Sequence, residues 1–168
     1  SEQATALATP AAVSVGITFA VGTAPVYQGE GAVNKLVYAN NYAEAVAALG
    51  YSDNWEDFTL CEVMKTHFGL YGVSPVIFVN VLDPAEHKES VESAEVTLVD
   101  GRAELPETAI KSTVVVKAAS AGNALVECTD YSCFYNDGKL IVEAIKGGAL
   151  SGSSAYIAYD KVKPSGVD

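Results

Sequence analysis

The stretch from Trp55 to Pro84 constrains the fold more than any other part of the chain. Its first half carries apolar residues at spacings of three and four, which is the period of an α-helix with one buried face. These residues are Leu60, Met64, Phe68 and Tyr71. We expect this helix to begin near Asp53 or Asn54, where acidic residues in the first turn would favour the helix dipole.

The second half of this stretch, from Pro75 to Leu82, is a short run rich in Val and Ile. Gly72 precedes it and Asp83-Pro84 follows it. Apolar and polar residues do not alternate cleanly in this run, which is typical of a strand covered on both faces in a parallel α/β sheet. The sequence therefore predicts a helix, a tight glycine turn, a buried strand and a proline stop.

Three shorter elements are expected before this stretch. β-branched and aromatic residues predict a strand over 17–21, and a shorter strand is expected over 35–38. Asn40 or Asn41 is expected to cap a helix over 42–49, which a glycine closes.

After Pro84 the composition changes. Residues 85–93 are charged and predict a connector, and from Ala94 onward the hydrophobic period becomes two. Asp100-Gly101 and Asn136-Asp137-Gly138 are hairpin turn signals. The strands expected in this half lie at 94–99, 112–118, 124–128, 133–145 (as a hairpin) and 155–162.

The chain therefore divides near residue 90. The predicted fold is mixed, α+β or α/β, with an extended arm or linker over 1–15 and an incomplete α/β domain over 16–90. A small all-β domain, an antiparallel barrel or sandwich, is expected over 91–163, and residues 164–168 lead back toward the first domain. A strand buried on both faces needs more partners than this half offers. We infer that another chain supplies them or that the sequence is a fragment of a larger subunit.

Charge excludes two classes of partner. The 168 residues carry a net charge of -11, with a sequence pI of about 4.5. Binding of nucleic acid or of anionic lipid relies on clustered cationic side chains, so neither is expected. No apolar run approaches the roughly 20 residues of a membrane-spanning helix. The chain shows no signal peptide and begins without Met, so we expect Ser1 to lie inside a longer protein.

The cysteines do not predict a reactive or metal site. An odd number of them, Cys61, Cys128 and Cys133, is not typical of a disulfide scaffold and suits a reducing compartment. Cys128 and Cys133 lie further apart than most paired zinc ligands, and a disulfide between them stays open. Cys61 and His67 are six residues apart, which places them on different helix faces.

One group of polar residues occupies a position that enzymes use. Asp83, Glu86 and His87 follow the buried strand, and α/β enzymes carry their chemistry at the carboxyl ends of parallel strands. Asp83-Pro84 is also a common turn initiator, and we expect a turn. The glycines at 28–31 lack the rest of a dinucleotide fingerprint. The sequence therefore predicts no catalytic, cofactor-binding or metal-binding residues.

Two further groups are interpreted as surface features. Asp53, Glu56 and Asp57 are expected on the solvated N-terminal turn of the long helix. Tyr156 and Tyr159 are three apart on the last strand and lie on opposite faces, so one of them is a candidate anchor for a protein partner.

Four segments resemble contractile phage tail sheath proteins, in particular those of myovirus-type prophages and of phage-tail-like bacteriocins. They are SEQATALATP, ITFAVGTAPV, AEAVAALGY and DNWEDFTLCEVMKTHFGLYGVSPVIFVNVLDP. The resemblance covers nearly the whole chain and is most specific over 14–87. Residues 94–162 are similar to the domain that such proteins insert into their α/β domain, on the outer surface of the sheath.

The resemblance implies a structural function without catalytic residues or cofactors. Sheath subunits polymerise around a tail tube and contract, which drives the tube through a target cell envelope. The implied partners are neighbouring sheath subunits and the tail tube protein, with no nucleic acid and no membrane bound by the subunit. The implied location is a virion tail or tail-like particle, assembled in the bacterial host cytoplasm.

Two alternatives come from other classes. One is a fragment of an α/β enzyme with a site near Asp83. The other is a surface carbohydrate-binding module formed by residues 94–162, although the only tryptophan, Trp55, lies in the other half.

Overall fold

Strand β3 (Val76–Asn80) is the centre of the first sheet in the computed structural model, which describes residues 16–167. It pairs in parallel with β1 (Thr18–Gly22) and antiparallel with β2 (Leu36–Ala39). The order β1-β3-β2 confirms a buried strand in the predicted range. The expected arm over 1–15 lies outside the described residues.

Helix α1 (Tyr42–Leu49) packs on this sheet. The side chain of Asn41 accepts a hydrogen bond from the backbone N–H of Glu44 at 2.9 Å, and Gly50 ends the helix with φ at +72°. The predicted range and glycine stop are confirmed, and of the two expected caps Asn41 is the one used.

The long helix starts later than predicted. Helix α2 (Thr59–Val63) continues directly into the π-helix η2 (Met64–Leu70). The expected start near Asp53 or Asn54 is wrong, because residues 54–58 form a turn and the first helical N–H groups bind Thr23. The backbone N–H of Thr59 donates to the Thr23 hydroxyl at 3.1 Å, and that of Leu60 donates to the Thr23 carbonyl at 2.9 Å.

The second lobe consists of two antiparallel sheets that face each other across one apolar core. One has the order β4-β9-β6, with β4 at Lys88–Thr97, β9 at Ser154–Val162 and β6 at Val115–Lys117. The other has the order β5-β8-β7, with β5 at Arg102–Pro106, β8 at Lys139–Ala144 and β7 at Tyr131–Asn136. The arrangement is a small sandwich, and the barrel alternative is wrong, since no barrel closes within residues 88–162.

Several strand boundaries in this lobe differ from the prediction. The predicted connector over 85–93 is wrong from Lys88 onward, because this segment pairs with β9 as strand β4, and Lys88 and Glu89 form ion pairs with Asp160 and Lys161 of that strand. The predicted strand over 124–128 is irregular and forms only isolated bridges. The β7–β8 hairpin is confirmed, with positive φ at Asp137 and Gly138, as a tight two-residue turn requires.

Short 3-10 helices complete the description. They are η1 (Val26–Gln28), η3 (Lys111–Thr113) and η4 (Pro164–Gly166).

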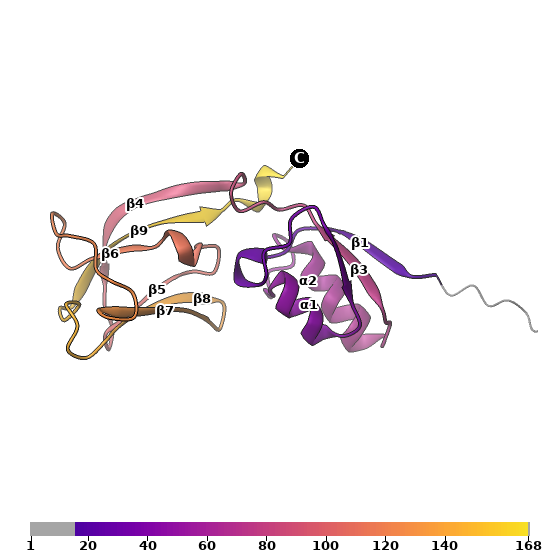
Figure 1. Ribbon diagram of the computed structural model, residues 1–168, viewed down its shortest axis with the longest axis horizontal. Coiled ribbons are helices and arrows are strands. Elements are labelled where there is room, and N and C mark those ends of the chain that lie inside the picture. Colours follow the sequence, from indigo (N-terminus) through magenta and orange to yellow (C-terminus); the bar gives the residue numbers. More distant parts are fainter. Residues whose placement is uncertain (1–15, 168) are drawn as a thin grey trace, which may run out of the picture.

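Figure 1 shows the two lobes side by side, joined at the top by β4 and β9. Below this connection the lobes share a small apolar cluster. Phe58, Cys61 and Leu82 come from the first lobe, and Ile110 and Val162 come from the second. All five are at least nine-tenths buried, so the junction is packed.

Glu107 adds polar contacts to this junction. Its backbone carbonyl accepts hydrogen bonds from the hydroxyl of Tyr27 at 2.9 Å and from the amide of Gln28 at 3.3 Å. Its carboxylate accepts from the hydroxyl of Ser52 at 2.7 Å. Three donors of the first lobe therefore bind one residue of the second.

Candidate interaction surface

The two faces of the first sheet differ in cover. Val76, Phe78 and Asn80 of β3 point toward the helices and are completely buried. Ile77 and Val79 point the other way and are only half-buried. Within residues 16–167 the helices lie on one side of the sheet only, so these residues do not supply the cover that the sequence predicts for the second face of this strand.

The uncovered side carries a first row of apolar side chains. The strand register places Phe19 of β1 and Tyr38 of β2 on either side of Ile77. Phe19 is 56% exposed and Tyr38 57%. Rings of this size normally lose most of their solvent contact on folding, so their exposure marks a candidate contact surface.

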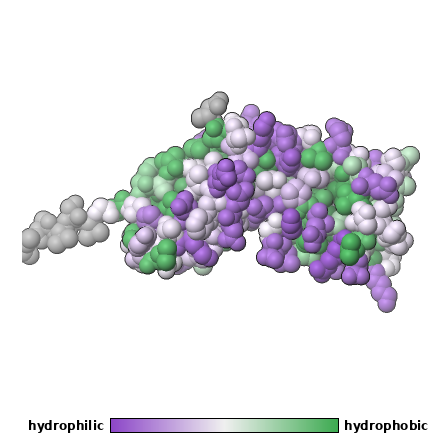
Figure 2. All heavy atoms as spheres, turned by 180° about the vertical axis from the view of Figure 1, so that it is seen from behind, coloured by the Kyte–Doolittle hydropathy of each residue, from purple (hydrophilic) through white to green (hydrophobic). Residues whose placement is uncertain are grey.

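A second row runs beside the first. Val21 of β1 and Leu36 of β2 flank Val79 in the same way. Val21 is 59% exposed and Leu36 71%. We call the six side chains of the two rows the open face: Phe19, Ile77, Tyr38, Val21, Val79 and Leu36. None of them is charged, and in Figure 2 apolar residues gather on the outer flank of the first lobe, where Figure 1 places β1 and β3.

The same sheet also has free edges. In the order β1-β3-β2, each outer strand pairs on one side only, and no further strand joins either edge within the described residues. Strand β1 reads TFAVG and contains neither the charge nor the proline that commonly protects an edge. Its unpaired N–H and C=O groups can accept an added strand.

The alternation of large and small side chains along β1 indicates the open face from the sequence. Along β1 the large residues Phe19 and Val21 alternate with Thr18, Ala20 and Gly22. The small residues face α2, and a side chain at Gly22 would overlap the hydroxyl of Thr59. Large residues on the side away from the helix indicate that this side is also meant to be covered.

The residues after β3 form a turn. The carboxylate of Asp83 accepts a hydrogen bond from the backbone N–H of Ala85 at 2.9 Å, and its carbonyl accepts from that of His87 at 2.7 Å. In return the backbone N–H of Asp83 donates to Nδ1 of His87 at 2.9 Å. The turn interpretation is confirmed, and Asp83 and His87 use these groups to hold the turn.

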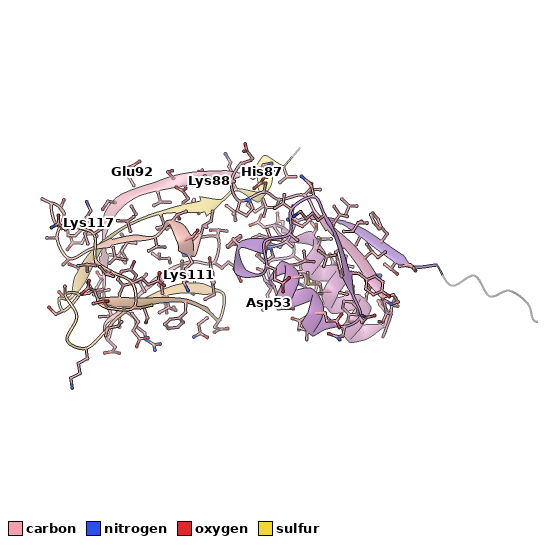
Figure 3. The ribbon with its side chains drawn as sticks, in the orientation of Figure 1. Asp53, His87, Lys88, Glu92, Lys111 and Lys117 are labelled. Carbon is pink, nitrogen blue, oxygen red and sulfur yellow. The ribbon has the colours of Figure 1, made fainter. Side chains whose placement is uncertain are left out.

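A groove of about 610 Å³ lies beside this turn, between the lobes. Its polar lining includes Asp83, Lys111 and Glu127, and Lys111 and Glu127 form an ion pair at 3.7 Å. Figure 3 shows His87 and Asp53 on opposite sides of the lobe junction, so these two titratable groups do not form one site. Glu86 is not among the residues that line the groove.

The cysteines are separate free thiols. Cys61 and Cys133 are buried and Cys128 is exposed, so the disulfide between Cys128 and Cys133 is not formed. Burial raises the pKa of Cys61 and of Cys133 to about 11, which makes both poor nucleophiles. His67 contacts the hydroxyl of Thr66 at 3.3 Å. Among residues 16–167 no group of three metal-ligating side chains occurs.

The acidic cluster lies in the turn before α2, not on the helix itself, with Asp53 and Glu56 exposed and Asp57 half-buried. Asp57 accepts a hydrogen bond from Asn54 at 2.8 Å, and Asp53 accepts one from Tyr51 at 3.0 Å. Glu56 does not lie on the groove beside Asp83.

The expected tyrosine anchor is wrong. Both Tyr156 and Tyr159 are half-buried, and Tyr159 packs against the core of the second lobe. The exposed aromatic side chains of the first sheet, Phe19 and Tyr38, are the better candidates.

No described helix has the length and apolar character needed to cross a membrane. No protein family model matches the chain. No solved structure matches it.

The chain is similar to a protein named tail sheath protein from Burkholderia phage BcepMu. The two are 31% identical over 151 residues, which cover 88% of this chain and 29% of the relative. The chain thus spans less than a third of the length of the relative it matches. This match confirms the resemblance to phage tail sheath proteins.

Proposed function

We propose that this chain is part of a structural subunit of a contractile phage tail sheath. The observation that carries the proposal is its 31% identity, over 88% of its length, to a phage tail sheath protein. In this role the subunit polymerises around a tail tube, and contraction of the polymer drives the tube through the envelope of a target cell.

The open face and the free edges of the first sheet support a role in assembly. A subunit of a polymer must present surfaces to its neighbours, and unpaired strand edges are a common means of joining chains. The partners we propose are neighbouring sheath subunits and the tail tube protein, in a virion tail or a tail-like particle of a phage, prophage or bacteriocin. Assembly takes place in the bacterial host cytoplasm, without enzymatic activity of the subunit and without nucleic acid or membrane binding.

We assign residues 16–90 to part of the sheath core domain and 91–163 to an inserted domain on the outer surface. The charged outer strand of the second lobe supports this assignment. Glu92 and Glu95 of β4, within the assigned range, are exposed. Figure 3 shows Glu92 and Lys88 along the outside of β4. Such a surface suits contact with water. Residues 1–15 are assigned to an arm, and residues 164–168 to the return into the core domain.

Electron microscopy of the full-length gene product tests the proposal. Expressed alone and examined by negative stain, it is expected to form long hollow tubes of one diameter. A defined small oligomer at every concentration and salt condition would contradict a sheath function, and is the result expected of an enzyme with a site near Asp83 or of a carbohydrate-binding module.

A further inference from the structure

The π-helix η2 is an unusual element. π-Helical hydrogen bonds are rare and are mostly confined to single turns inside α-helices, frequently at functional sites, whereas η2 covers seven residues. It continues α2 without a break, and the chain turns away at Gly72, with φ at +60°. One helix therefore changes its hydrogen-bond register halfway along its length.

The backbone hydrogen bonds at the end of η2 define this register. The N–H of Tyr71 donates to the carbonyl of Thr66, five residues earlier, at 3.0 Å, and the N–H of Val73 donates to the carbonyl of His67 at 2.7 Å. In an α-helix the N–H of Tyr71 would donate to the carbonyl of His67 instead, four residues earlier. A change to the α-helical register therefore moves this N–H by one acceptor.

The apolar period of the sequence fits the α-helical register. Tyr71 follows Met64 by seven residues, which is two turns of α-helix to within about 20°. Met64 is completely buried against the first sheet, so an α-helix would place Tyr71 on the same side. In the π-helix the wider turn carries Tyr71 away from that side, and its side chain is 72% exposed. The sequence pattern and the observed hydrogen bonds thus favour different registers.

The neighbouring residue Leu70 behaves differently. It is 73% exposed in the structure. At about 100° per residue, an α-helix would place Leu70 about a third of a turn from Met64, outside the buried stripe. The two registers therefore differ in the exposure of Tyr71 but not of Leu70.

Opposing contributions favour the two registers. Burial of the Tyr71 ring favours the α-helix, because it removes a large apolar surface from water. The hydroxyl of Thr66 donates to the carbonyl of Glu62 at 2.8 Å, and such bonds to the preceding turn distort an α-helix. Two conformations balanced in this way commonly differ by a few kcal/mol, so that the minor one is roughly 0.1–10% populated.

We propose that residues 64–73 form a conformational switch between these two registers. In the π register, which the structure shows, the ring of Tyr71 is displayed at the end of the first lobe. In the α register the N–H of Tyr71 moves to the carbonyl of His67, and the ring turns to the side of the helix that carries Met64. A partner that contacts the ring stabilises the π register, since a ligand favours the state that it binds. This inference does not depend on the proposed function.

Relaxation-dispersion NMR of the unassembled protein tests the proposal, because helix register shifts take microseconds to milliseconds. We expect exchange at the backbone amides of residues 66–73, with a minor population of roughly 1% or more. In the major state we expect a hydrogen-bond scalar coupling between the amide nitrogen of Tyr71 and the carbonyl carbon of Thr66. Absence of exchange in this segment, or a major-state coupling to the carbonyl carbon of His67, would overturn the proposal.

A pair of matched variants identifies the side chain that drives the exchange. Tyr71→Gln removes the ring whose burial favours the α register and would place an amide on the apolar side. We expect it to abolish the exchange at residues 66–73. Leu70→Gln, at the adjacent and equally exposed position, should keep the minor population within about twofold of the wild type, because Leu70 is outside the buried stripe in both registers. Exchange that persists in Tyr71→Gln, or that is lost in both variants, would overturn the proposal.

Discussion

At the residue scale, Asn80 is the buried polar group that organises the first lobe. Its side chain is completely buried at the end of β3. The side-chain oxygen accepts hydrogen bonds from the backbone N–H groups of Ala24 at 3.0 Å and Leu82 at 3.1 Å. The side-chain nitrogen donates to the carbonyls of Ala32 at 3.1 Å and Leu82 at 2.8 Å. One amide thus satisfies the backbone of three loop segments.

We therefore expect Asn80→Ala to lower the free energy of unfolding by about 3 kcal/mol, because two buried N–H groups lose their acceptor. Asn123→Ala, at an exposed position of the second lobe, is the control and should change it by no more than about 0.5 kcal/mol. Urea denaturation of both variants measures the difference. A loss below about 1 kcal/mol for Asn80→Ala would contradict the role assigned to this amide.

Thiol reactivity gives a second prediction at this scale. Burial raises the pKa of Cys61 and Cys133 to about 11, whereas Cys128 is exposed. With a disulfide reagent at pH 8, we expect one thiol of the folded chain to react quickly and the other two only on unfolding. Cys128→Ser should abolish the fast phase. Rapid reaction of two thiols in the folded wild type would contradict this, because it would show that Cys61 or Cys133 is accessible to the reagent.

Acid stability gives a third prediction. The carboxylate of Asp130 accepts backbone hydrogen bonds from Val126 at 2.8 Å and Ala149 at 2.9 Å, and these bonds hold its pKa below the ordinary value. The pKa of Asp130 is lower in the folded than in the unfolded chain. The stability that its ionised carboxylate contributes is therefore present above about pH 4 and is lost as pH falls through the folded pKa.

Asp130→Ala should therefore lower Tm at pH 6 and weaken the fall of Tm between about pH 4 and pH 2. Glu92→Gln, at an exposed position of β4, is the control and should leave the Tm profile near that of the wild type. An Asp130→Ala profile parallel to that of the wild type over the whole range would contradict the assignment.

At the element scale, the lobe junction depends on the loop that holds Glu107. The Tyr27 hydroxyl, whose pKa is raised by burial, donates to the Glu107 carbonyl across the junction. We expect Tyr27→Phe to cost about 1 kcal/mol and to speed amide hydrogen exchange around residues 107–113. Tyr156→Phe, within the second lobe, is the matched control. Unchanged exchange in Tyr27→Phe would mean that the apolar cluster alone fixes the junction.

Local periodicity predicts several elements well and others poorly. The helix over 42–49 has its cap and glycine stop in the sequence, and the β7–β8 hairpin has its Asp137-Gly138 turn, so both are predictable from neighbouring residues. The start of α2 is not, because its first N–H groups bind Thr23, which is 36 residues away. The start of β4 is not predictable either. Its charged residues are typical of a connector, and the partners that pair with Lys88 and Glu89 lie far along the chain on β9.

At the scale of the whole molecule, the sequence predicts that the first sheet needs further partners, but it does not predict on which side of the sheet they bind. The apolar run at 75–82 implies cover on both faces, yet only the structure shows which face is open, since that depends on how β1 and β2 align with β3. The same limit applies to Tyr159 of β9: its position in the strand is visible in the sequence, whereas its half-burial depends on packing against the core between the two sheets.

The two lobes also differ in what they offer to partners. The outer strand of the second lobe is charged, and within residues 16–167 the first lobe combines an open apolar face with two unpaired sheet edges. In a chain with a net charge of -11, such an apolar surface is the part suited to permanent contacts. This asymmetry agrees with a first lobe inside an assembly and a second lobe outside it.

A cryo-electron microscopy reconstruction of the particle that contains this protein tests the proposed sheath function most directly. We expect the two-lobed fold to occupy a helically repeated density around a tail tube, with the first lobe toward the tube and the charged second lobe outermost. A particle in which this fold occurs outside the helical layer, or in which no repeated layer surrounds the tube, would contradict it.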